Sequence, residues 1–101
     1  MNHSRAGEAG RIIHDCWSAG TVVDELPENC RPATLEAGYE VQRSFVQHSG
    51  ETVVGWKIAA TSIAGQRHIN VEGPIAGRLL ESRVHHRPGR VQLGRNRMSV
   101  A

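Results

Sequence analysis

Apolar residues recur at helical spacing near the start of the chain. Between residues 5 and 19 they fall three or four positions apart and form one stripe, which consists of Ala6, Ala9, Ile13, Cys16 and Trp17. This spacing predicts a first helix, and Gly20 stands where a residue with left-handed backbone commonly ends one. Residues 21–33 contain Pro27 and Pro32, and we expect a connecting loop that no regular element fits.

A second helix is predicted over residues 35–48. The hydroxyl of Thr34 can accept a hydrogen bond from a first-turn amide, and Glu36 suits the positive end of the helix dipole. Gly50 follows as a terminator. The face expected to be apolar, with glutamine as its polar exception, consists of Leu35, Tyr39, Gln42, Phe45 and Val46.

The pattern changes to period two at residues 52–58, which predicts a strand. Lys57 shares a face of this strand with Val53 and Gly55, and the opposite face carries Val54, Trp56 and Ile58.

Thr61 and Ser62 can cap a short helix that runs to about His68. Short strands are expected at 75–80, 83–86 and 90–93. Helices that precede strands indicate an α+β fold. We therefore expect a helical region at 1–50 and the start of a β-rich domain at 51–101.

The composition excludes several classes of protein. A length of 101 residues allows one small domain at most. No apolar run approaches the ~18–20 residues of a membrane span, and the N-terminus lacks the apolar stretch of a secretory signal. We therefore expect a cytoplasmic protein with no membrane partner. Cys16 and Cys30 stand in no metal or disulfide pattern and are expected to be reduced thiols.

The charge distribution and the missing motifs argue against several further classes of function. The formal net charge is +2, and five arginines but no acids follow Glu81. This basic tail lacks lysine and interleaved aromatic residues, so we expect no nucleic-acid partner. The six histidines form no HxxxH or HExxH pair, so no metal site is predicted from them. Glycine-rich phosphate loops and a GxSxG elbow are likewise missing from the sequence.

Lys57 is the only lysine in the chain, and it falls within a predicted strand. A charge within a strand is costly unless it faces a cavity, a partner or solvent. Gly55 leaves open volume beside it, and Thr61 with Ser62 offers hydroxyls close by in the sequence. One interpretation is a site for a small carboxylate, and the other is a lysine at a sheet edge that reaches solvent.

Three segments, in order and at consistent spacing, resemble one enzyme family. They read RPATLEAGYEVQ at 31–42, VGWKIAATS at 54–62 and VEGPIAGRLL at 71–80, with SRVH at 82–85 after them. They are similar to the RPxTxxxAYxVQ, GWKIGATS and GVxGPxxGRLL segments of the 2-keto-4-pentenoate hydratases and the related oxalocrotonate decarboxylases. Both groups belong to the fumarylacetoacetate hydrolase superfamily, and the resemblance covers residues 26–85 closely.

This resemblance implies a hydro-lyase reaction in the catabolism of aromatic compounds. A 2-hydroxy-2,4-dienoate is ketonised, and water then adds to give a 4-hydroxy-2-oxo acid. A divalent metal, Mg²⁺ or Mn²⁺, chelates the 2-oxo acid in such enzymes. Lys57 matches the active-site lysine, which would pair with the substrate carboxylate or assist proton transfer, and Thr61 and Ser62 match positions near the substrate. Decarboxylation stays open because the related decarboxylases share these segments.

The chain also departs from the family pattern. Ala59 replaces the usual glycine, and no aspartate occurs in the segment that contains Gly73 and Pro74. The carboxylates that hold the family's metal begin with a Glu-x-Glu pair downstream, whereas no acidic residue follows Glu81. We therefore expect no metal ligands in this chain.

Two hypotheses follow from the resemblance and these departures. The chain is the truncated N-terminal portion of a metal-dependent hydratase, an incomplete piece of the fumarylacetoacetate hydrolase-like β-rich fold that is inactive alone and self-associates. Alternatively, it is a non-catalytic binding or oligomerisation module derived from that family. A nucleic-acid module is a distant third hypothesis, and it predicts binding that declines steeply with salt.

Overall fold

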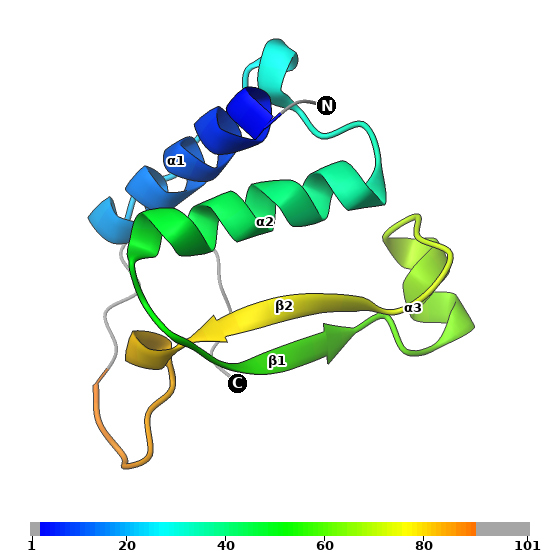
Figure 1. Ribbon diagram of the computed structural model, residues 1–101. Coiled ribbons are helices and arrows are strands. Elements are labelled where there is room, and N and C mark those ends of the chain that lie inside the picture. The colour runs from blue at the N-terminus through cyan, green and yellow to red at the C-terminus, as the bar shows by residue number, and fades with distance from the viewer. Residues whose placement is uncertain (1–2, 91–101) are drawn as a thin grey trace. The chain divides into compact units, whose positions relative to one another are not determined.

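A computed structural model describes residues 3–90, which adopt an α+β fold (Figure 1). The described residues contain three α-helices, two short 3₁₀ helices and one two-stranded antiparallel sheet. They divide into two compact units. Residues 51–84 form one unit, and the described residues on either side of that stretch form the other.

The helical unit is built on α1 (His3–Ala19) and α2 (Leu35–Ser49), and both predicted helices are confirmed. Local signals set their ends. The side chain of Thr34 accepts a hydrogen bond from the backbone nitrogen of Ala37 at 3.0 Å, which caps α2 as predicted. Gly20 and Gly50 follow the two helices with φ angles of 69° and 65°, the left-handed conformation that glycine adopts without steric cost.

Small side chains form the core of this unit. The buried cluster consists of Ala6, Ala9, Cys30 and Val41, with Ile12 and Leu26 packed against it. α1 and α2 lie against each other (Figure 1). The hydroxyl of Ser44 in α2 donates to the carbonyl oxygen of Gly7 in α1 at 3.3 Å, so a polar contact also joins the two helices.

The predicted buried face of the second helix was wrong in part. Leu35 is 55% exposed, and the buried residues of α2 are Ala37, Val41 and Ser44. The reason is the close approach of α1, which presents alanine and glycine and leaves room only for small side chains opposite. The larger residues of the predicted face are half-buried; they are Tyr39, Gln42, Phe45 and Val46.

The connection between the helices was predicted as irregular throughout, but it contains the 3₁₀ helix η1 (Glu28–Cys30). This turn buries Cys30, which is 1% exposed. Arg31 follows and donates from Nε to the carbonyl oxygen of Leu26 at 2.7 Å, closing the loop on itself.

The second unit consists of β1 (Val53–Ala59), α3 (Ile63–His68) and β2 (Ile75–Leu80), which confirms the predicted first strand, short helix and second strand. β1 and β2 pair antiparallel, and α3 lies in the connection at one end of the sheet (Figure 1). The register sets Trp56 opposite Arg78 and Lys57 opposite Gly77, with an irregularity between Val53 and Gly55.

The strand predicted at 83–86 was wrong, because the chain turns away from the sheet after β2. Residues Glu81–Arg83 form the 3₁₀ helix η2. The backbone nitrogen of Ser82 donates to Oε1 of Glu51 at 2.8 Å, and its hydroxyl donates to Oε2 at 2.9 Å. The carboxylate of Glu51 thus holds the turn that follows β2. The strand predicted at 90–93 lies outside the described residues, except for its first position.

Candidate functional site

Lys57 lies in the middle of β1 with an exposed side chain. Its cross-strand partner is Gly77, and Gly55 lies two positions before it on the same strand. Neither glycine has a side chain that could cover the lysine. Among residues 3–90, no hydrogen bond or ion pair holds the ammonium group, so it is accessible to an anion from solution.

The turn from β1 to α3 positions the two hydroxyl residues. Ala60 adopts a φ of 57°, in the left-handed region that side chains seldom enter. The side-chain amide of Gln66 in α3 donates to the carbonyl oxygen of Ala60 at 3.1 Å. Gly65 allows the close packing of this turn, because a Cβ there would lie 3.2 Å from Oγ of Ser62. The turn is therefore held by the hydrogen bond from Gln66 and by the close approach of Gly65 to Ser62.

Ser62 is the N-cap of α3, and its Oγ accepts a hydrogen bond from the backbone nitrogen of Gly65 at 3.0 Å. A hydroxyl that accepts one bond still has its own hydrogen to donate. Capping and ligand binding are therefore compatible at this residue. Thr61 is exposed beside it.

The three predicted site residues thus share the 51–84 unit, within one strand and the turn that follows it. No hydrogen bond joins Lys57 to Thr61 or Ser62 within the described part of the chain. The second and third family-like segments pair with each other, since they contain β1 and β2. This pairing places a lysine, an arginine and two glycines on one small sheet.

The first family-like segment has structural roles within the helical unit. Thr34 caps α2, and Arg31 pairs with Glu25 at 3.0 Å.

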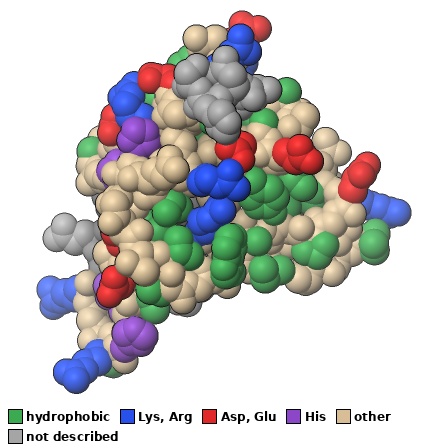
Figure 2. All heavy atoms as spheres, in the orientation of Figure 1, with side chains coloured by type: hydrophobic (Ala, Val, Ile, Leu, Met, Phe, Trp, Pro, Cys, Tyr) green, Lys and Arg blue, Asp and Glu red, His purple; other side chains and the backbone are tan. Residues whose placement is uncertain are grey.

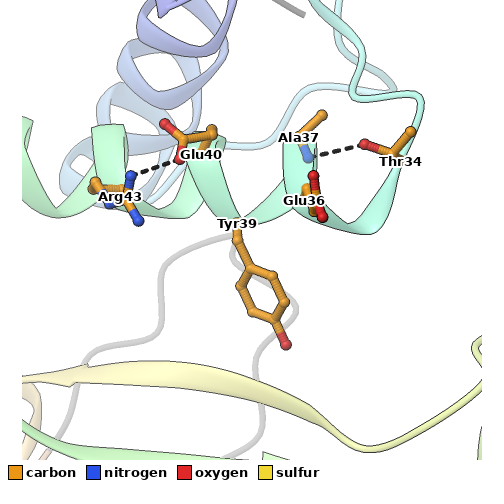
Figure 3. Close-up of a pocket in the computed structure, with 6 residues that line it drawn as sticks. All are labelled: Thr34, Glu36, Ala37, Tyr39, Glu40 and Arg43. Atoms are coloured by element: carbon orange, nitrogen blue, oxygen red, sulfur yellow. Dashed lines mark hydrogen bonds and ion pairs between the residues drawn. The ribbon is translucent and has the colours of Figure 1, made fainter.

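A shallow hollow of about 380 Å³ lies along α2 and is lined by Thr34, Glu36, Ala37, Tyr39, Glu40 and Arg43. Arg43 binds Glu40 at 2.5 Å, and Tyr39 points away from the helix axis (Figure 3). The arginine of this hollow is thus already neutralised by its neighbour.

Sequence reasoning missed a cluster of rings where α1 meets α2. Trp17 packs edge-on against Phe45 at 5.1 Å between ring centroids, and His14 lies 5.8 Å from Phe45 and 6.4 Å from His48. A signal was present, because each helix carries one histidine and one aromatic residue three positions apart. Recognising it required knowing which faces of the helices meet.

The described residues do not by themselves fit the divalent metal that the resemblance implies. Magnesium prefers several oxygen ligands, chiefly carboxylates. Within residues 3–90, no three His, Cys, Asp or Glu side chains come together as a metal site would need.

No helix among the described residues combines the length and the apolar character that crossing a bilayer requires. Comparisons of the chain with protein-family models, with curated proteins and with solved structures found no match.

Proposed function

We propose that this chain supplies the lysine-bearing part of a metal-dependent hydratase, a cytoplasmic enzyme of the 2-keto-4-pentenoate type. The substrate is a small 2-hydroxy-2,4-dienoate, and the reaction adds water to it in aromatic catabolism. Mg²⁺ or Mn²⁺ would supply Lewis-acid chemistry from ligands outside the described residues. Under this proposal the isolated chain is inactive, because the family's Glu-x-Glu metal ligands have no counterpart after Glu81 in this sequence.

The observation that carries this proposal is the accessible ammonium of Lys57. It lies on β1 with Gly55 two positions before it and Gly77 opposite it on β2, within the segment that resembles the family's active-site motif. An ammonium in this setting can form a charge-assisted hydrogen bond with the carboxylate of a dienoate. The hydroxyls of Thr61 and Ser62 would donate to the same anion and fix its orientation.

The test is an assay on the native polypeptide or complex that contains this sequence, purified from its source. Loss of the dienol absorbance is followed with Mg²⁺ present. Lys57→Met removes the charge but keeps the side-chain length, and Arg67→Met is the matched control on exposed α3. Loss of a positioned charge is expected to lower turnover ~100-fold or more, while the control stays near wild type.

Two results would count against the proposal. Full turnover in the Lys57→Met variant would remove lysine from the site. Turnover by the isolated 101-residue chain would show that the catalytic groups are all present in it. Product analysis distinguishes hydration from decarboxylation, since only the second reaction releases carbon dioxide.

A second candidate is a non-catalytic binding or oligomerisation module, and one observation favours it. The face of β1 that carries Val54, Trp56 and Ile58 is about half exposed at each of these residues. Apolar side chains grouped in this way are typical of interaction surfaces. This hypothesis predicts that the native polypeptide associates with itself and shows no turnover of dienoates, whatever metal is added.

A further inference from the structure

The sheet of the 51–84 unit presents apolar side chains along β1. Val54 is 49% exposed, Trp56 53% and Ile58 55%. Figure 2 shows hydrophobic side chains grouped on the part of the surface where Figure 1 draws the strands and α3. Arg78 from β2 places its guanidinium carbon 4.8 Å from the centroid of the Trp56 ring, which engages one face of the ring.

β1 also has an unpaired edge among the described residues, since the sheet contains only two strands. Two strands alone are marginally stable in water, and an added strand strengthens them. The outer edge of β1 offers unpaired backbone groups beside its apolar face, which is the arrangement that strand addition uses. β2 presents less apolar surface, because its residues are half-buried and Leu80 is 3% exposed.

The sequence of β1 is complementary to itself when two copies run antiparallel about Trp56. In that register Trp56 faces Trp56 of the other copy, and Val54, which lies at the irregularity in the pairing with β2, comes opposite Ile58. Lys57, the only charged residue of the strand, faces Gly55 of the other copy, where no side chain opposes it. A shift that centres the pair on Lys57 would set two ammonium groups opposite each other, which is unfavourable.

We propose that β1 pairs with β1 of a second copy of this chain, antiparallel and centred on Trp56. The two copies form a continuous four-stranded sheet whose shared apolar stripe contains Val54, Trp56 and Ile58 from each chain. A two-fold axis relates the copies, so the same residues serve both sides of the interface. The pairing goes beyond the proposed catalytic function and does not depend on it.

The experiment is sedimentation velocity of the full chain from roughly 1 µM to roughly 200 µM, the range in which a weak homodimer dissociates. Wild type is expected to shift from monomer to dimer. Val54→Glu and Ile58→Lys each replace both Val54–Ile58 pairs of the homodimer with a charge opposite an apolar side chain, and each should weaken the dimer several-fold. Mixing the two variants sets glutamate opposite lysine in one half and keeps isoleucine opposite valine in the other, so a heterodimer should return.

The matched control is Val23→Glu, the same substitution at a position that is 50% exposed outside the sheet. It should dimerise like wild type. Circular dichroism checks that each variant is folded. If one does not fold, hydrogen exchange of wild type at low and high concentration replaces it, and those amides of Val53–Ala59 that do not bond β2 should gain protection only at high concentration.

Three outcomes would overturn the proposal. The first is a wild-type chain that stays monomeric over the whole range. The second is a dimer that the mixture of variants does not restore, which would place the interface elsewhere or in another register. The third is protection, in the monomer, of the β1 amides that do not bond β2, which would show that another segment of the same chain occupies this edge.

Discussion

Gly10 of α1 lies directly against Ser44 of α2, with no space for a methyl group between the helices. A Cβ at residue 10 would overlap the Ser44 side chain and come 2.8 Å from the backbone nitrogen of Phe45. Backbone atoms cannot move aside without shifting the whole helix. This pair therefore fixes how closely the two helices approach.

Gly10→Ala is expected to destabilise the chain. Overpacking a close contact costs about 1–3 kcal/mol, while alanine gains about 1 kcal/mol of helix propensity over glycine. The overlap with backbone puts the cost at the upper end, so we expect a net loss of about 1–2 kcal/mol. Urea unfolding followed by circular dichroism measures this change.

Gly7→Ala is the control for Gly10→Ala, because a Cβ at residue 7 would meet nothing within 4 Å. Only helix propensity changes there, so stability should rise by up to about 1 kcal/mol. Equal effects of the two substitutions would contradict the close contact at Gly10.

The helix ends could be predicted from sequence because their causes are local. Thr34 caps α2 through an amide three residues away, and Gly50 ends the same helix through its own backbone conformation. The same holds for Gly20 after α1. Each signal lies within one turn of the boundary that it sets.

The buried face of α2 could not be predicted from its own residues. Leu35 is exposed while Ser44 is buried, because α1 presents Ala6, Ala9 and Gly10 at the contact. Which side chains are buried therefore depends on the partner helix. The turn after β2 was missed for a similar reason, since Ser82 is bound by Glu51, which comes 31 residues earlier in the chain.

From the sequence, the candidate site could be predicted only as a stretch of residues and not as a three-dimensional arrangement. Alternation places Lys57 on a strand, and Ser62 before an apolar residue predicts the cap of α3. The left-handed backbone of Ala60 was not predictable, since alanine has no preference for it. A hydrogen bond from Gln66, which comes later in the chain, stabilises that conformation.

Ala60→Gly is expected to stabilise the 51–84 unit. Alanine in the left-handed region costs about 1–2 kcal/mol, and glycine avoids this cost but loses about 0.5–1 kcal/mol in chain entropy. The expected net gain is about 0.5–1 kcal/mol, measured by urea unfolding. Ala64→Gly, an exposed helical position of α3, serves as the control and should destabilise by a similar amount. Destabilisation by both substitutions would contradict backbone strain at Ala60.

Glu8 gives α1 a stability that depends on pH. Arg11 donates from Nη2 to Oε1 of Glu8 at 2.5 Å, and this hydrogen bond lowers the pKa of the Glu8 carboxyl below its ordinary 4.5. The unfolded chain keeps the ordinary pKa and therefore binds the proton more readily. The contribution is present above pH 4.5 and is lost as the pH falls through the lowered value.

Wild type should therefore lose stability more steeply on acidification than Glu8→Gln, which cannot titrate. The difference is small because both side chains are about half exposed. Carboxyl titration by NMR measures the pKa directly. In Arg11→Gln the pKa of Glu8 should rise toward its ordinary value, and a value unchanged from wild type would show that Arg11 does not cause the shift.

Ser62 offers a way to separate capping from substrate binding. Ser62→Ala removes the acceptor for the Gly65 amide and should cost about 1 kcal/mol of stability in urea unfolding. Ser62→Asp keeps a good cap, since aspartate accepts the same bond, so stability should stay near wild type. Under the proposed function the added charge repels the substrate carboxylate, and the native polypeptide should show a raised KM for the dienoate. A Ser62→Asp variant with wild-type stability and wild-type KM would restrict Ser62 to its structural role at the start of α3.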